Sequence, residues 1–129
     1  MITKNEGVRV RIVPTYPDKV ALQPPMCKAI YEEPQNKGPI TALRRFLINN
    51  HVEYGDIFAT KCTGEKRTCD YMIFIFVLGV PKRNADKVVK RALKAAFKKA
   101  KDLNASEVYV QNVKIPGANW AKAIGDAQK

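Results

Sequence analysis

The run Tyr71-Met-Ile-Phe-Ile-Phe-Val-Leu78 carries no charged side chain and no alternation of polar with apolar residues. A strand in the middle of an α/β sheet has this composition, because other elements cover both of its faces. The run is also much shorter than the roughly 20 apolar residues that cross a bilayer. It therefore predicts a buried strand near the centre of an α/β sheet.

The residues just before this run predict its antiparallel partner. A strand is expected from Tyr54 to Cys62, because that segment contains the consecutive apolar residues Ile57-Phe-Ala59. The intervening Thr63-Gly-Glu-Lys-Arg67 has the composition of a turn. The two strands and this turn together indicate a β-hairpin.

Two further elements precede the hairpin. Residues 8–12 alternate valine or isoleucine with arginine, which predicts a strand with one buried face that ends at Pro14. Gly38-Pro39 begins a helix that should end near Asn49, because proline fits the first helical turn. Between them, a short helix through Cys27 is the only regular element that the pattern suggests.

The longest predicted helix runs from about Ala85 to Leu103, with Asn84 as its N-cap. Its length suits a crossover to a second buried, parallel strand at residues 108–113. A short helix through Trp120 then docks on the sheet. The apolar face of the long helix consists of Val89, Ala92, Leu93, Ala96 and Ala100.

These elements give the order β-α-β-β-α-β-α in a chain of 129 residues, which is the size of one compact domain. We therefore expect a single α/β domain, residues 1–129, with a mixed sheet flanked by helices in two or three layers. The N-terminus lacks the apolar segment of a secretory signal. We expect a cytoplasmic protein with no membrane association.

The formal net charge is +11, from 23 basic and 12 acidic residues, which suggests a polyanionic partner. The stretch from Lys82 to Lys101 holds nine basic residues and one acid, Asp86. At helical spacing these cations form a ribbon opposite the apolar face, although a merely solvated face has the same pattern. The candidate nucleic-acid-binding residues are Lys82, Arg83, Lys87, Lys90, Arg91, Lys94, Lys98 and Lys101.

Other kinds of site find little support in the residues. The chain contains neither of the common glycine-rich phosphate motifs, so no cofactor is predicted. Cys27, Cys62, Cys69 and His51 do not have the short spacings of a zinc site, so no metal and no catalytic residue is assigned. Cys62 and Cys69 flank a turn and could pair, but a cytosolic setting predicts free thiols.

The segment Lys114-Ile-Pro-Gly-Ala-Asn-Trp120 leaves a predicted parallel strand and enters a helix. Backbone N–H groups at such a turn can bind an anion. A tight strand-to-helix connection without a ligand has the same sequence pattern. Both interpretations stay open at this point.

From Gly38 onward the chain contains Tyr54-Gly-Asp-Ile-Phe-Ala-Thr60, the buried run 71–77, the long helix, and Val108-Tyr-Val-Gln-Asn-Val-Lys-Ile-Pro-Gly117 followed by Asn119-Trp120. This arrangement resembles the second half of a macro domain. Macro domains bind ADP-ribose, and some remove it from proteins. The resemblance implies that Pro116, Gly117, Ala118 and Asn119 form the loop around the diphosphate of an ADP-ribose-type ligand.

The residues therefore leave three functions open. The first is a non-enzymatic module that binds RNA or DNA phosphates through the basic helix. The second is a macro-like binder of ADP-ribose or a nucleotide, with hydrolytic removal of ADP-ribose as an extension. The third is a structural or protein-interaction component.

Overall fold

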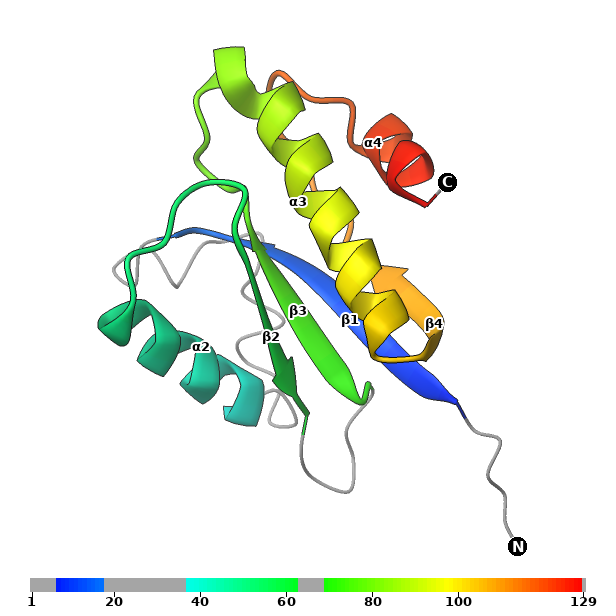
Figure 1. Ribbon diagram of the computed structural model, residues 1–129. Helices are drawn as coiled ribbons and strands as arrows, with labels where there is room; N and C mark the ends of the chain where they lie inside the picture. The colour runs from blue at the N-terminus through cyan, green and yellow to red at the C-terminus, as the bar shows by residue number, and fades with distance from the viewer. Residues whose placement is uncertain (1–6, 18–36, 63–68, 129) are drawn as a thin grey trace, which may run out of the picture.

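The computed structural model describes residues 7–17, 37–62 and 69–128, which form a four-stranded mixed sheet with helices on both faces (Figure 1). The strand order is β2-β3-β1-β4. Strand β1 is parallel to both of its neighbours, β3 and β4, whereas β2 is antiparallel to β3. The elements are β1 (Val8–Thr15), α2 (Lys37–Asn49), β2 (Ile57–Lys61), β3 (Tyr71–Phe76), α3 (Lys82–Asp102), β4 (Ala105–Val110) and α4 (Trp120–Ala127). This is the predicted order β-α-β-β-α-β-α, in three layers.

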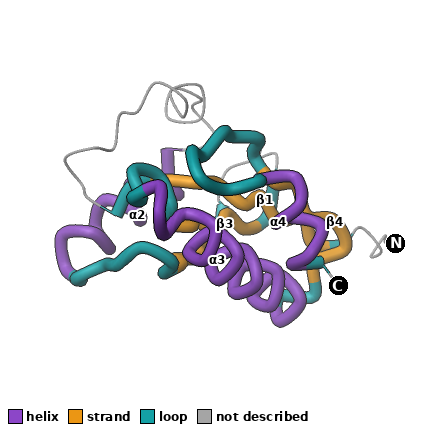
Figure 2. Tube along the Cα trace, turned by 90° about the horizontal axis from the view of Figure 1, so that it is seen from above, coloured by secondary structure: helices purple, strands orange, loops and turns teal. Residues whose placement is uncertain are grey.

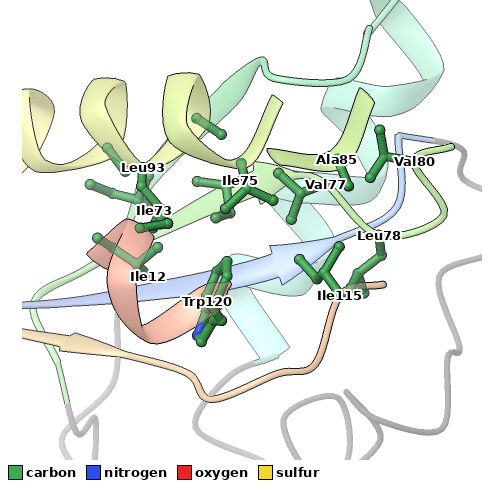
Figure 3. Close-up of a cluster of buried hydrophobic side chains, with 14 of the residues drawn as sticks. Ile12, Ile73, Ile75, Val77, Leu78, Val80, Ala85, Leu93, Ile115 and Trp120 are labelled. Atoms are coloured by element: carbon green, nitrogen blue, oxygen red, sulfur yellow. The ribbon is translucent and has the colours of Figure 1, made fainter. Parts of the chain in front are cut away.

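Two apolar clusters, one on each face of the sheet, make up the core. Helices α3 and α4 cover one face, where Ile12, Ile73 and Ile75 meet Leu93 and Trp120 (Figure 3). Figure 2 shows these two helices together on one side of the strands. On the other face, α2 packs against a second cluster that contains Met72, Phe74 and Phe76 from β3.

Strand β3 contributes to both clusters, as its unbroken apolar sequence predicts. Successive side chains of a strand point to opposite faces, so alternate residues of β3 enter alternate clusters. Every residue from Met72 to Val77 is fully buried. The hairpin with β2 is confirmed, and its hydrogen bonding continues past β2, because Gly55 N–H donates to the Phe76 carbonyl oxygen at 3.0 Å.

Pro14 does not end the first strand, contrary to the prediction. Strand β1 continues to Thr15, and Pro14 pairs in register with Ile75 of β3. The Ile12 carbonyl oxygen accepts a hydrogen bond from the Gln111 N–H, so the backbone polar groups of Ile12 point toward β4. Alternate residues of a strand direct these groups to the same side, so those of Pro14 point toward β4 as well. Since β4 ends at Val110, the missing N–H of Pro14 removes no hydrogen bond of the sheet.

The prediction that Asn84 caps the long helix is wrong. Helix α3 begins three residues before the predicted start, with Pro81 at the N-cap position and no side-chain cap. Asn84 N–H donates to the Pro81 carbonyl oxygen at 2.9 Å, which closes the first turn. Proline suits this position because its fixed φ leads into the helix and the N–H that it lacks has no partner there anyway.

The final strand is also placed differently from the prediction. It spans Ala105–Val110 rather than 108–113, and it pairs with β1, which lies between it and β3. Strand β4 is therefore an edge strand, with Val108 and Val110 half-buried and Tyr109 58% exposed. The valines suggested a buried strand because an apolar run does not reveal whether a strand has one neighbour or two.

Three predicted features lie outside the described residues: the short helix through Cys27, the hairpin turn at 63–67, and the thiol of Cys27. No helix in the described part of the chain has the length and apolar character to cross a membrane.

Candidate functional site

The carboxyl ends of β1, β3 and β4 lie at one edge of the sheet, because these strands are parallel. From this edge the chain leads from β1 to α2 on one face, but from β3 to α3 and from β4 to α4 on the other. Adjacent strands whose connections diverge to opposite faces leave a crevice outside their carboxyl ends, where open α/β sheets bind ligands. This edge, called the carboxyl edge below, is where the predicted ligand loop lies.

The predicted ligand loop forms a tight turn at the carboxyl edge. Ala118 N–H donates to the Ile115 carbonyl oxygen at 3.1 Å, and Gly117 has a φ of +91°, which favours glycine. Ile115 is buried and anchors the turn in the core, whereas Pro116, Gly117 and Asn119 are exposed and Ala118 is half-buried. The exposed part of the turn is therefore available to a ligand.

Gly117 also contacts the first residue of α3. A Cβ at Gly117 would overlap the backbone carbonyl of Lys82 and lie 2.9 Å from its Cγ. This contact brings together two predicted sites, the ligand loop and the beginning of the basic helix. No pattern in the sequence indicates that these two segments are neighbours.

The start of α3 is strongly electropositive. Its N-terminus has no side-chain cap and no acidic residue in the first turn, and Lys82 and Arg83 are both exposed there. The aligned peptide dipoles place a partial positive charge at the same end of the helix. The two side chains and the helix end therefore favour a bound anion beside Gly117.

Helix α4 begins at the same turn. Asn119 is its N-cap, and its Oδ1 accepts a hydrogen bond from the Lys122 N–H at 3.1 Å. Trp120 follows and is 7% exposed, with its ring in the cluster beneath α3 and α4. The α4 N-terminus is thus a second positive helix end beside the Gly117 turn.

The loop after β3 adds two tyrosines that the sequence interpretation missed as site residues. Gly79 has a φ of +87°, and a Cβ there would lie 3.1 Å from both the Tyr16 ring and the Tyr54 hydroxyl oxygen. Both tyrosines are half-buried at the carboxyl edge. A glycine between a buried strand and Pro81 was the available signal, but it does not reveal which side chains approach it.

The basic ribbon is present as predicted and faces away from the core. The side chains of all eight candidate residues are exposed, and the opposite face of α3 is buried. Lys90 is partly neutralised, since its Nζ lies 3.0 Å from Asp86 Oδ2. Arg91 extends toward the turn that precedes β2, and its Cδ would lie 3.4 Å from a Cβ on Gly55. The ribbon is otherwise continuous along the helix.

A groove of about 710 Å³ lies between α3, β4 and the end of α4. Phe97 and Val108 are among its apolar lining residues, and three lysines of the ribbon lie along it. The groove is at the opposite end of α4 from the Gly117 turn, so the predicted ligand loop does not line it. The lining residues are Lys94, Phe97, Lys98, Lys101, Val108, Ala127 and Gln128.

Two of the predicted free thiols lie side by side. Cys62 and Cys69 are both buried free cysteines, and their Sγ atoms are 3.2 Å apart. His51 follows the end of α2, and its side chain is 86% exposed. Its Nε2 lies 3.5 Å from Glu53 Oε2. Among the described residues, no group of three or more histidine, cysteine or acidic side chains is arranged to hold a metal ion. The two thiols therefore form a chemical feature separate from the carboxyl edge.

Comparison with solved structures identifies the class of this fold. The chain is similar to the macrodomain of Thermus aquaticus DarG, with a TM-score of 0.63 and 17% identity over 95% of this chain and 83% of the other. The macrodomain of Mycobacterium tuberculosis DarG gives 0.62 and 17% over 95% and 80%. A macrodomain protein from Streptomyces coelicolor gives 0.58 and 15% over 98% and 84%. The chain therefore has the macro-domain fold.

The fold likeness extends beyond the part of the chain in which the sequence suggested it. The match covers 95% or more of the chain, and so includes β1 as well as everything from α2 onward. No protein-family model matches the chain, and no curated protein matches it in sequence.

Proposed function

We propose that this protein binds an ADP-ribose-type nucleotide, with the diphosphate at the carboxyl edge beside the Gly117 turn. The contact between Gly117 and Lys82 carries the proposal, because it joins an exposed turn to two helix N-termini and two cationic side chains. A diphosphate matches these donors and their charge. The macro-domain fold supports the same ligand class.

Several features of the edge suit such a ligand. Gly117 keeps the backbone accessible where any side chain would overlap Lys82. The exposed Lys82 and Arg83 can donate charge-assisted hydrogen bonds to phosphate oxygens. Tyr16 and Tyr54 flank the neighbouring loop at Gly79 and offer aromatic surface to a base or ribose. The proposal is for binding, and it assigns no catalytic residue.

Calorimetric titration with ADP-ribose tests this proposal. We expect saturable binding that Gly117→Glu abolishes, because the new carboxylate repels phosphate and fills the turn. Gly125→Glu is the matched control, since Gly125 lies on α4 with no atom within 4 Å of a Cβ. Circular dichroism of both variants separates loss of binding from loss of folding. Absence of any ADP-ribose binding by the folded wild-type protein would overturn the proposal.

A second candidate is binding of a nucleic-acid backbone or another polyanion by the basic ribbon. The exposed lysines along α3 favour it, and Lys94, Lys98 and Lys101 line the groove beside that helix. The macro-domain fold favours the nucleotide over this partner, so we place it second.

The salt dependence of binding separates the two candidates. Contacts with a phosphate backbone release counterions, so affinity for single- or double-stranded probes should fall by orders of magnitude between about 50 and about 200 mM salt. Replacing Lys90, Lys94 and Lys98 with glutamate should abolish that binding while ADP-ribose binding persists. If the triple variant binds the nucleic-acid probes with the same affinity as the wild-type protein, the ribbon is not their binding site.

A further inference from the structure

The thiols of Cys62 and Cys69 face each other at the end of the β2–β3 hairpin. Their Sγ atoms are 3.2 Å apart, and the residues are only 3% and 4% exposed. The backbone holds them in this position, because Cys62 N–H donates to the Asp70 carbonyl oxygen at 2.9 Å and Lys61 pairs with Tyr71. A bond between the two sulfur atoms would therefore require little movement of either strand.

The surroundings activate one of the two thiols. The pKa of Cys69 is lowered chiefly by a hydrogen bond with the Cys62 side chain, and further by the positive charges of Arg11 and Arg9. Burial and the Asp70 carboxylate act in the opposite direction. Because a thiolate is the nucleophilic form of cysteine, Cys69 is the residue of the pair that should react first.

Neither Cys62 nor Cys69 is part of the proposed nucleotide site. The pair lies where β2 ends and β3 begins, whereas the Gly117 turn lies at the carboxyl ends of the parallel strands β1, β3 and β4. The two locations are at opposite edges of the sheet. A reaction at the thiols can therefore be measured independently of nucleotide binding.

We propose that Cys62 and Cys69 are a modification site, at which hydrogen peroxide converts the thiol pair into a reversible disulfide. Only a small, uncharged oxidant suits so buried a pair, and peroxide accepts the two electrons that the two thiols give up.

In the first step the Cys69 thiolate attacks one peroxide oxygen, the O–O bond breaks, the other oxygen leaves as hydroxide, and Cys69 becomes a sulfenic acid. The Cys62 sulfur then attacks the Cys69 sulfur, the S–O bond breaks, and a second hydroxide leaves. The protons of the two thiols convert both hydroxides to water. One peroxide is reduced as two thiols become one disulfide, and a dithiol reductant reverses the change.

The disulfide would join the end of β2 to the start of β3. Both cysteines belong to the apolar cluster that packs against α2. A cross-link removes conformations from the unfolded chain, so the oxidised protein should melt at a higher temperature than the reduced protein. Nucleotide affinity should be the same in the two states.

The test uses the full chain with Cys27→Ser, so that only the two facing thiols remain. After stoichiometric peroxide we expect both thiols to disappear from titration, the intact mass to fall by two hydrogen atoms, and dithiothreitol to restore both. Peptide mapping should find the bond between Cys62 and Cys69, and the melting temperature should rise by several degrees. Thiols that stay titratable, or sulfinic acid in place of the disulfide, would overturn the proposal.

Single replacements in the same background give the matched controls. Cys62→Ser leaves Cys69 without a partner, so peroxide should yield a sulfenic acid at Cys69 that dimedone traps. Cys69→Ser should react more slowly, because Cys62 then lacks the activated neighbour. Equal rates in the two variants would contradict the assignment of Cys69 as the reacting thiol. Dimers linked between molecules, with no internal bond in the parent, would contradict the pairing itself.

Discussion

Gly117 lies so close to Lys82 that even a single added methyl group would overlap the Lys82 carbonyl oxygen. The contact joins the turn after β4 to the first turn of α3, two segments that meet only through the fold. Glycine is required here twice, by this approach and by its φ of +91°. The position is therefore a sensitive test of the geometry of the proposed site.

Gly117→Ala should lower the free energy of unfolding by about 2 kcal/mol or more, because both the backbone and the contact resist a side chain. Gly125→Ala is the matched control. Gly125 lies in α4 with open space around it, so alanine there should stabilise the protein by about 0.5–1 kcal/mol through helix propensity. Urea denaturation of both variants measures the difference. Equal effects of the two substitutions would contradict the contact with Lys82.

Asn119→Ala should cost about 1 kcal/mol of stability, because it removes the side-chain acceptor for the Lys122 N–H at the start of α4. Asn84→Ala should be close to neutral, since Asn84 lies inside the first turn of α3 and caps nothing. Thermal melts of the two variants compare a true N-cap with a residue that only resembles one in sequence. A larger loss of stability in Asn84→Ala than in Asn119→Ala would show that Asn84 caps α3, as the sequence suggested.

Lys82→Gln should weaken ADP-ribose binding about tenfold, the loss of one charge-assisted hydrogen bond to phosphate. Lys61→Gln should leave the affinity unchanged, because Lys61 is an exposed lysine at the far end of β2, away from the carboxyl edge. Titration calorimetry at a fixed salt concentration compares the two. Equal losses would point to overall charge rather than to this site.

The reaction of Cys69 with peroxide should reach half of its maximal rate at a pH below the ordinary pKa of a cysteine thiol. The lowered pKa in the folded protein means that the thiolate appears as pH rises through that lower value. Cys62→Ala removes the hydrogen bond that is the largest cause of the shift, so the half-maximal pH should move upward. Stopped-flow rates across pH check this. An unchanged profile would show that Cys62 does not activate Cys69.

The same lowered pKa has a consequence for stability. Since the folded state holds the Cys69 thiolate more favourably than the unfolded state does, its contribution to stability is present above the unfolded pKa and is lost as pH falls through the folded pKa. Because the thiol is tied to Cys62, this contribution should disappear in Cys62→Ala. Denaturation of the reduced protein at several alkaline pH values measures it.

Local sequence patterns predicted the parts of the fold that depend on local chemistry. Strand β3 was identified because the six consecutive residues from Met72 to Val77 have no polar side chain, as expected for a strand that is covered on both faces. All six are fully buried. The amphipathic face of α3 was identified by spacing. Both signals are carried by the element itself.

Features that depend on a neighbour were not predictable. Pro14 fits within β1 only because β4 stops before reaching it. Tyr109 is exposed because it lies on the same face as Arg11, where the cluster that packs against α2 includes no residue of β4. The approach of Gly117 to Lys82 likewise depends on where two distant turns meet. Within the candidate site, the turn at Gly117 had a sequence signal of its own, whereas Gly79 was the only signal for Tyr16 and Tyr54 and does not reveal which side chains approach it.

Trp120 is the single tryptophan of the chain, and it directly follows the turn that we propose binds the diphosphate. Its indole is almost wholly enclosed, and within the described part of the chain its Nε1 meets no hydrogen-bond acceptor. Any ligand that shifts the Gly117 turn also shifts the environment of this ring. The protein thus carries its own fluorophore at the proposed site, and its emission can report occupancy without a label.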